Sequence, residues 1–311
     1  MVAAMPAWFI SLAGLGALYL SAACLRLVAH LGRWSMDHPV HPLDTPLHLA
    51  LYLRRPIDLR RRYGSWAVVT GPTTGLGRST AMELARRGIS LVLLDLDEAN
   101  LDQVADTIRK THPCVEAKTV VFDLSLVGTP AGDEGTRRLR KAIKGLDVGM
   151  LVNNAAVNRP GALYVHEADM ERLARMILVN VMGLTEVTTA VLPGMVERGR
   201  GAIVNHLSRG LDAEYKSKGI DVQCQVPFYV HTGMLSPAIK ATMTFSAFVA
   251  TADEYARDAA RWIGHGGALC VPDASQQLQW FLAGLLPSFV HDWYRLRQHL
   301  KHRAILRRKL A

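Results

Sequence analysis

The chain has 311 residues, half of them hydrophobic, which suits one domain with a sizeable core and appended segments. Its net charge of +9 admits nucleic acid, an anionic membrane surface or a phosphorylated ligand as partner. The cations cluster beside apolar segments and no nucleic-acid-binding motif accompanies them, which favours a membrane and a nucleotide or CoA over nucleic acid. Four scattered cysteines without a C-x-x-C pair predict reduced thiols in a cytosol-facing domain.

The first segment, residues 1–33, is predicted to be a membrane anchor. Residues 7–25 carry no charge, and a helix of this length spans about 28 Å, close to the thickness of a bilayer core. The alternative is a cleaved signal peptide, but no basic stretch precedes the run, which is also longer than a usual signal peptide core. Because arginines follow it, we expect a single-pass protein whose main domain faces the cytosol. These arginines are Arg54, Arg55, Arg60, Arg61 and Arg62.

Residues 34–63 are predicted to be an extended connector between the anchor and the main domain. Four prolines, Pro39, Pro42, Pro46 and Pro56, interrupt any regular element there. The neighbouring histidines raise the question of a metal site, but they lack paired ligand spacing on a regular element. We therefore expect no metal.

The stretch from Trp66 to Asp95 predicts a strand, a glycine turn, a helix and a second strand. A β-branched run leads into the turn at Gly71, Gly75 and Gly77, a helix follows, and a second apolar run ends in Asp95. Glycines in such a turn let the backbone approach a pyrophosphate at the helix N-terminus. An acidic residue at the end of the second strand can accept hydrogen bonds from a ribose. The stretch therefore predicts dinucleotide binding.

Strands and helices continue to alternate along the chain, which predicts an α/β fold, a Rossmann-type doubly wound parallel sheet following the N-terminal transmembrane helix. Asp123 and Asn153 end the third and fourth strands, at the edge where ligands lie in such sheets. Asn180 lies in the middle of a helix, where asparagine is unfavourable, so it is either a site residue or a satisfied core residue. The helices are expected at 97–110, 136–144 and 167–197, the last broken near Pro193-Gly194, and the strands at 120–123, 148–153, 202–207 and 220–226.

The main domain is expected to cover residues 64–275, with an apolar segment and a basic tail in 276–311. A helix is predicted at 255–263. Residues 278–290 form an apolar run that is too short to span a bilayer and is interrupted by Pro287. It could lie at a membrane interface, form the wall of an acyl tunnel or be buried.

Several motifs resemble the short-chain dehydrogenase/reductase family. The turn has the spacing Thr70-Gly71-x-x-x-Gly75-x-Gly77, and Asn153-Asn154-Ala155-Ala156 resembles the family's NNAG segment with alanine for glycine. Longer stretches at 64–71, 191–195 and 219–227 resemble the very-long-chain 3-oxoacyl-CoA reductases of microsomal fatty-acid elongation, whose relatives include 17β-hydroxysteroid dehydrogenases. The resemblance covers about residues 50 to 300.

The resemblance implies an endoplasmic reticulum membrane protein that reduces a 3-oxoacyl-CoA or a steroid with NADP(H), alongside other elongation enzymes. Asp95 instead favours NAD(H), because a carboxylate repels the 2′-phosphate of NADP. The matching catalytic positions are Asn180, whose family counterpart orders a water for the catalytic lysine, and Ser208. The matching cofactor-binding positions are Gly71, Thr73, Thr74, Gly75, Leu76, Gly77, Arg78, Asp95, Asp123, Asn153, Ala155 and Thr232.

One family motif is missing: the chain contains no Tyr-x-x-x-Lys. In the family this lysine lowers the pKa of the tyrosine, which then acts as acid or base. After Ser208 the sequence resembles only the far end of the helix that carries the pair, and Tyr215 and Lys218 are three residues apart instead of four. The segment from Ser208 to Gly219 is close to the shortest crossover between parallel strands. Three hypotheses stay open: a reductase, a non-catalytic dinucleotide-binding partner, and a truncated isoform.

Overall fold

The computed structural model describes residues 16, 18–22, 24, 56–158, 163–205, 209–234, 249–265 and 267–310. Most of the predicted anchor and connector, as well as Ser208, therefore lie outside the described residues. The chain divides into two compact units, and the larger one comprises Pro56–Gln277 and Arg295–Ala311. The smaller unit includes Leu278–Tyr294.

Seven strands of the described chain form one parallel sheet in the order β3-β2-β1-β4-β5-β6-β9. The strand order reverses between β1 and β4, as in doubly wound folds. Apolar runs form the central strands because both faces are covered; every residue of β1 and β4 is buried. The strands are β1 (Trp66–Thr70), β2 (Ser90–Asp95), β3 (Ala117–Val121), β4 (Val148–Asn153), β5 (Gly201–Asn205), β6 (Ile220–Gln225) and β9 (Leu269–Cys270). A separate pair consists of β7 (Val230–His231) and β8 (Ala250–Thr251).

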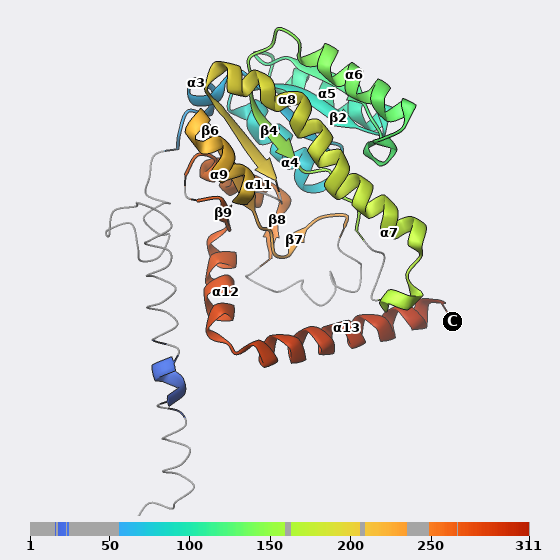
Figure 1. Cartoon of the computed structure of the whole chain (residues 1–311), viewed down its shortest axis with the longest axis vertical. Helices are drawn as coiled ribbons and strands as arrows, with labels where there is room; N and C mark the ends of the chain where they lie inside the picture. The colour runs from blue at the N-terminus through green and yellow to red at the C-terminus, as the bar shows by residue number, and fades with distance from the viewer. Residues whose placement is uncertain are drawn as a thin grey trace, which may run out of the picture. The chain divides into compact units, whose positions relative to one another are not determined.

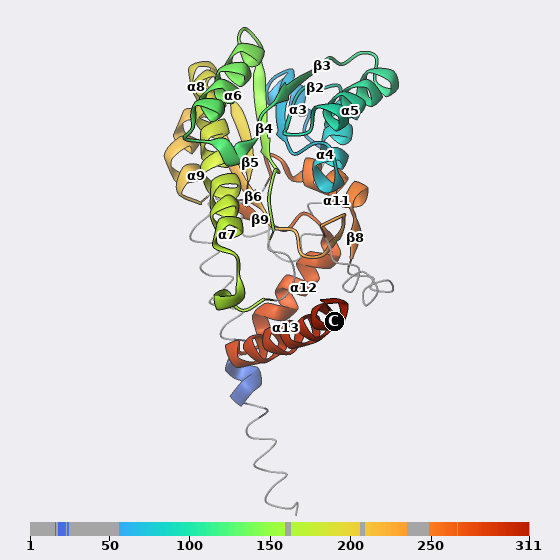
Figure 2. The ribbon, with the colours of Figure 1, turned by 90° about the vertical axis from the view of Figure 1, so that its right-hand side faces the viewer.

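Helices cover both faces of the sheet, so the fold has three layers (Figure 2). Alternate residues of β1 show this division: Val69 belongs to the core on one face, and Val68 to the core on the other. The first face carries α3 (Leu59–Tyr63), α4 (Gly75–Arg86) and α5 (Glu98–Thr111). The second face carries α6 (Pro130–Ile143), α8 (Leu184–Arg198) and α9 (Arg209–Tyr215).

Helix α11 (Ala252–Trp262) packs beside α4 and closes the first layer (Figure 1). The Ser79 hydroxyl donates to Asp253 at 2.5 Å, and the Arg87 guanidinium donates to the Ala260 carbonyl at 3.2 Å. Gln223 and Gln225 of β6 are buried, and both donate to carbonyls in or just after α11. These bonds tie the last long strand to the helix beside the glycine turn.

The long helix predicted at 167–197 is interrupted, but not where the sequence indicated. It comprises α7 (Met170–Ile177), a π-helical stretch (Leu178–Gly183) and α8, which continues through Pro193. The predicted break near Pro193-Gly194 is therefore wrong. Burial of Val191, Leu192 and Met195 against the sheet outweighs the backbone hydrogen bond that proline removes. The wider π turn lies instead around Asn180.

Shorter elements complete the described chain. Of the residues that the structure describes, only Met170–Arg198 is long and apolar enough to span a membrane, and it is partly buried as a core helix of the fold. The C-terminal helices are α12 (Ala274–Leu285) and α13 (Ser288–Leu310). The 3-10 turns are η1 (Leu124–Leu126), η2 (Val165–Glu167) and η4 (Lys216–Lys218).

Candidate dinucleotide site

The turn after β1 is built so closely that only glycine fits at its key positions. Gly71 has φ of +66°, and a Cβ added there would lie 2.9 Å from the Cα of Ala155. A Cβ on Gly77 would lie 2.0 Å from the carbonyl oxygen of Gly71. The turn therefore folds back on α4 and presses against the segment after β4, leaving the backbone open to a ligand.

A network of hydrogen bonds fixes the turn to the end of β4. The Thr70 hydroxyl accepts from the backbone N–H of Asn154 at 3.0 Å and of Ala155 at 2.9 Å. The side-chain amide of Asn154 donates to the carbonyls of Thr70 at 3.1 Å and Gly71 at 3.0 Å. These bonds hold the carboxyl ends of β1 and β4 together, where a doubly wound sheet binds its ligand.

The N-terminus of α4 has the features of a phosphate site. Its N-cap residue, Thr74, makes no side-chain capping bond, and the first turn contains no acidic residue. The first N–H groups of this helix can therefore bind an anion, and Arg78 is exposed one turn along. Leu76 lies on the inner side of the same turn, where it lines a cavity.

Asp95 lies at the end of β2, beside the turn. One carboxylate oxygen accepts from the Thr73 hydroxyl at 2.8 Å, and the other accepts from the backbone N–H of Leu96 at 2.7 Å. The carboxylate is half-buried, so it is held in one orientation and keeps a face toward solvent. This arrangement suits acceptance of hydrogen bonds from a ribose, as the sequence predicts.

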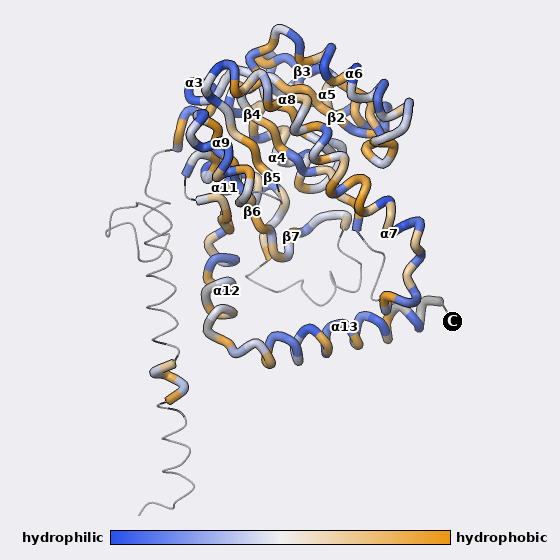
Figure 3. The backbone as a smooth tube through the Cα atoms, viewed as in Figure 1, coloured by the Kyte–Doolittle hydropathy of each residue, from blue (hydrophilic) through white to orange (hydrophobic). Residues whose placement is uncertain are grey.

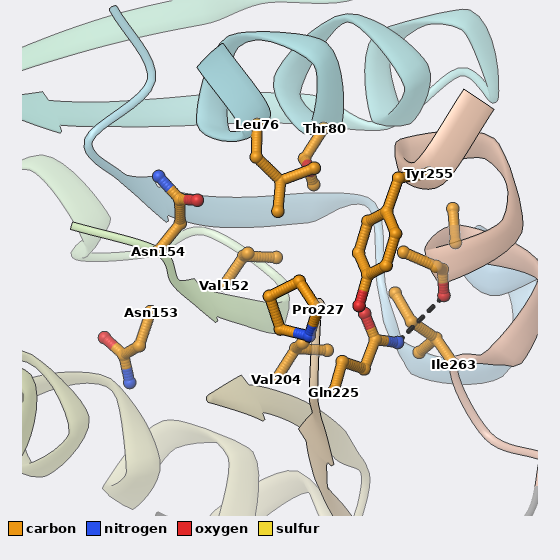
Figure 4. A pocket seen from close by; sticks show the side chains of 12 residues that line it. Leu76, Thr80, Val152, Asn153, Asn154, Val204, Gln225, Pro227, Tyr255 and Ile263 are labelled. Carbon is orange, nitrogen blue, oxygen red and sulfur yellow. Dashed lines mark hydrogen bonds between the residues drawn. The ribbon is translucent and has the colours of Figure 1, made fainter. Parts of the chain in front are cut away.

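The two other predicted strand-end residues have different surroundings. Asp123 caps the 3-10 turn η1, where it accepts from the backbone N–H of Ser125 at 2.9 Å. The Asn153 side chain points away from Asn154 and away from the glycine turn (Figure 4). It is buried and donates to the Thr188 hydroxyl of α8 at 2.9 Å. Asn153 therefore positions α8 on the sheet, and its neighbours Asn154 and Ala155 contact the turn.

Asn180 forms a pair of hydrogen bonds with one loop residue. Its amide oxygen accepts from the Val157 N–H at 2.8 Å, and its amide nitrogen donates to the Val157 carbonyl at 2.9 Å. The side chain thus anchors the segment after β4 to the π-helical stretch, a type of distortion that is frequent at functional sites. Ser208, the other predicted catalytic residue, lies outside the described residues.

Thr232, which follows the short strand β7, lies close to the glycine turn. A Cβ built on Gly75, whose φ is +54°, would lie 3.3 Å from the Cβ of Thr232. The segment after β6 therefore lies against the turn that the sequence assigns to the cofactor. This contact places Thr232 with the other predicted cofactor-binding residues.

Tyr215 and Lys218 lie near the amino ends of the strands, whereas the glycine turn lies at the carboxyl ends. Helix α9 runs back from the carboxyl end of β5 to the amino end of β6, so its last residue, Tyr215, is next to the start of β6. Tyr215 packs on the core of the second face, and the Lys218 ammonium lies 4.7 Å from its ring centroid. The pair therefore cannot replace Tyr-x-x-x-Lys at the glycine turn.

A cavity of about 40 Å³ lies under the turn, between α4, α11 and the ends of β4 to β6 (Figure 4). It is large enough for a water molecule. The buried Tyr255 hydroxyl, which lines it, has no hydrogen-bond partner within the described residues. Burial raises the pKa of this phenol well above its ordinary value, so Tyr255 stays protonated at neutral pH and is a poor proton donor for catalysis.

Sequence reasoning missed three residues that shape this site: Thr70, Asn154 and Tyr255. Thr70 and Asn154 are within the motifs that indicated the turn, so the motifs could have identified them. Tyr255 lies on the apolar face of an amphipathic helix. Nothing in the sequence distinguishes it there from an ordinary core residue.

Comparison with known proteins agrees with this geometry. The sequence model of the short chain dehydrogenase family matches residues 65–209. An Arabidopsis thaliana protein named as very-long-chain 3-oxoacyl-CoA reductase-like is 38% identical over 271 residues, covering 79% of this chain and 84% of the relative.

A Homo sapiens protein named inactive hydroxysteroid dehydrogenase-like protein 1 is 38% identical over 216 residues. That match covers 62% of this chain and 64% of the relative, less than two thirds of its length. Among solved structures, a short-chain dehydrogenase from Sphingobium yanoikuyae in complex with NADPH superposes with a TM-score of 0.59 at 26% identity. The superposition covers 76% of this chain and 94% of that structure.

Proposed function

Because the chain belongs to the short-chain dehydrogenase/reductase family, we propose that it binds a nicotinamide dinucleotide but does not reduce carbonyl substrates at an enzymatic rate. The observation that carries this proposal is the contrast between an intact glycine turn and a missing Tyr-x-x-x-Lys pair. The relatives' names support an acyl-CoA as the substrate class to which the fold is adapted. A ketosteroid is the second candidate, supported by the hydroxysteroid dehydrogenase-like relatives.

The described residues fit a dinucleotide. The glycine turn leaves a cradle that a Cβ at Gly71 or Gly77 would fill, and the uncapped N-terminus of α4 suits a pyrophosphate. Asp95 would accept from the adenosine ribose. When bound, the cofactor supplies a hydride to a carbonyl carbon.

Proton supply is where this chain differs from the family. An oxygen that gains charge as its carbon is reduced needs a proton donor and a nearby positive charge. The amide of Asn180 does not titrate and is already bonded to Val157, while the pKa of Tyr255 is raised by burial. A serine hydroxyl at Ser208 is too weak an acid. Loss of general acid catalysis alone costs about 10²–10⁴-fold in rate.

The proposal also includes a cellular setting. The uncharged run at 7–25 and the names of the reductase relatives support a protein anchored in the endoplasmic reticulum membrane, with its main domain in the cytosol. In that setting a chain without turnover would act as a dinucleotide-binding partner of fatty-acid elongation enzymes. The alternative is that the chain is a truncated isoform of a reductase, which would also lack turnover.

Calorimetry on the full chain in detergent tests binding. We expect NADH or NADPH to bind, and Gly77→Ala to abolish binding because its Cβ would meet the Gly71 carbonyl. Gly210→Ala is the matched control, since Gly210 is exposed and an added Cβ there meets nothing within 4 Å. Absence of binding by the unaltered chain would leave a poorly folded isoform as the better explanation.

Oxidation of NAD(P)H with a 3-oxoacyl-CoA tests the missing chemistry. We expect negligible turnover by the 311-residue chain. We expect turnover to rise by at least about 10²-fold when a family-length segment with Tyr-x-x-x-Lys is inserted between Ser208 and Arg209. Equal rates for the two chains would refute the proposal.

A further inference from the structure

Seven helices of the described chain lead into strands of the main sheet, and all of them end at one side of it. The strands are parallel, so a helix that follows one strand must run back to the amino end of the next. Contacts between these ends agree: Arg62 of α3 donates to Asp221 of β6 at 3.0 Å, and Arg200 before β5 donates to Asp147 before β4 at 3.1 Å. We call the last turns of these helices, together with their connections to the next strands, the amino edge.

The positive charge of the chain is concentrated at the amino edge. Its segments contain 15 lysines and arginines but only six aspartates and glutamates. The chain outside them contains 21 residues of each sign, so the amino edge accounts for the whole net charge of +9. The segments are 60–65, 83–89, 108–116, 140–147, 195–200, 212–219 and 259–268.

The helix dipole explains only part of this concentration. A cation in the last turn of a helix is stabilised by the negative end of the dipole. That effect does not require a further cation after the helix, as at Lys144 and Arg200, or three successive arginines, as in α3. Hydrophilic positions dominate α3 and α9 (Figure 3). Six cations of the amino edge are exposed and form no ion pair within the described residues: Arg60, Arg61, Lys110, Arg140, Lys141 and Lys144.

The carboxyl edge, where the helices begin, has acidic first turns in several helices. Glu98 lies in the first turn of α5, Asp133 in that of α6, and Asp253 and Glu254 in that of α11. Helix α4, at the glycine turn, is the exception described above. An anionic surface would therefore attract the amino edge and repel these parts of the carboxyl edge, which gives the domain a preferred orientation on such a surface.

The order of the chain favours a lipid surface over an acidic protein as the partner. Helix α3 precedes β1 and ends at the amino edge, so the connector from the predicted anchor at 7–25 leads into the domain through α3. A short tether keeps the segment that it joins at a high effective concentration near the bilayer. The cytosolic leaflet is anionic and attracts exposed lysines and arginines beside it.

We propose that the amino edge of the main sheet rests on the anionic headgroups of a lipid bilayer, held by charge and not by insertion. The glycine turn, at the carboxyl edge, would then face away from the lipid and stay open to a dinucleotide from the cytosol. This contact rests on the proposed membrane setting and does not depend on dinucleotide binding.

Energy transfer to acceptor-labelled headgroups tests the orientation, with the full chain in bilayer discs. Cys114 is an exposed thiol of the amino edge, and Cys24→Ser removes the other exposed thiol, so a donor dye can be attached to Cys114. Ala131→Cys with Cys114→Ser and Cys24→Ser is the matched reporter, because Ala131 is exposed at the start of α6. The two ends of this helix are about 20 Å apart.

We expect stronger transfer from Cys114 than from the reporter at position 131 in discs that contain phosphatidylserine. The difference should disappear in phosphatidylcholine alone and in high salt. Equal transfer from the two positions, or the same transfer in both lipids, would overturn the proposal. A response of the Cys114 dye to poly-glutamate but not to phosphatidylserine would overturn it in favour of an acidic protein. A chain that stays out of the discs would contradict the anchor, and its transfer from solution would still report this contact.

Charge variants test which residues hold the domain on the lipid. Lys141→Ala with Lys144→Ala should lower the ratio of docked to undocked molecules in single-molecule transfer roughly 30-fold, because each cation near an anionic surface strengthens binding about fivefold. Arg172→Ala with Arg175→Ala removes the same charge from exposed positions of α7 and should leave the ratio unchanged. Equal losses in the two variants would show that net charge, and not the amino edge, attracts the domain.

Discussion

At the scale of single residues, we expect Asp95 to set the preference between NADH and NADPH. Its carboxylate accepts from the Thr73 hydroxyl and from the backbone N–H of Leu96, both uncharged donors. A negative charge at this place attracts ribose hydroxyls and repels a 2′-phosphate. The sequence resemblance implies NADP(H), whereas this carboxylate favours NAD(H).

We expect the unaltered chain to bind NADH at least as tightly as NADPH. Asp95→Gly combined with Leu96→Arg should reverse the preference, because the exposed position 96 would then present a cation to the 2′-phosphate. Titration calorimetry with both cofactors gives the ratio of the dissociation constants.

Asp97→Asn is the control for this exchange. It removes a nearby charge, while its side chain can still cap α5, where Asp97 accepts from the backbone N–H of Asn100. We expect a smaller change in the NADH-to-NADPH ratio than for the change at Asp95. Tighter binding of NADPH by the unaltered chain would show that Asp95 does not set the preference.

The role of a residue could be predicted where it is part of a sequence motif. It could not be predicted where it depends on a hydrogen-bond partner far away in the sequence. The glycines at 71, 75 and 77 follow from spacing alone, because the turn demands them. The side chain of Asn153 had two possible directions, and its choice depends on Thr188, a residue 35 positions later. Asn180 was recognised as unusual, but its partner Val157 could not be inferred from helix propensity.

At the scale of elements, strands were easier to predict than the ends and interruptions of helices. Strands β1, β2 and β4 are continuous apolar runs, since both faces of a parallel sheet are buried. Strand β9 has two residues, which is too short for any periodic pattern. The π-helical stretch leaves the apolar spacing of its helix nearly unchanged, so the sequence pointed to Pro193 instead.

The contact between η2 and α13 predicts a specific response to acid. The Arg303 guanidinium lowers the pKa of Glu167 from its ordinary value of 4.5 to about 2. The ion pair therefore contributes fully above the ordinary value and is lost only as the pH falls through about 2. We expect the amides of 295–307 to keep their protection, after correction for intrinsic exchange, down to about pH 3.

Glu167→Gln should expose the same amides already at pH 7, because a neutral amide cannot pair with the buried guanidinium. Glu171→Gln, at an exposed position of α7, serves as the control and should leave their protection unchanged. Loss of protection near pH 4 in the unaltered chain would mean that Glu167 titrates normally and that Arg303 does not hold the helix.

At the scale of the whole molecule, the proposed membrane orientation gives a direct test. Protease added to intact microsomes should digest the domain after Gly64, because the arginines that follow the uncharged run favour the cytosolic side. Detergent should make no further difference to that domain. Protection that disappears only with detergent would place the domain in the lumen and reverse the orientation.

The contact between Thr232 and Gly75 has a consequence for the speed of ligand exchange. Gly75 and Thr232 are more than 150 residues apart in the sequence, yet a Cβ built on Gly75 would lie 3.3 Å from the Cβ of Thr232. A dinucleotide over the turn would therefore enter and leave past the segment after β6. Residence time would then depend on how often that segment moves aside, and affinity on Asp95 and the helix terminus. The segment after β6 would thus control the dissociation rate of the dinucleotide, while Asp95 and the N-terminus of α4 would control its binding affinity.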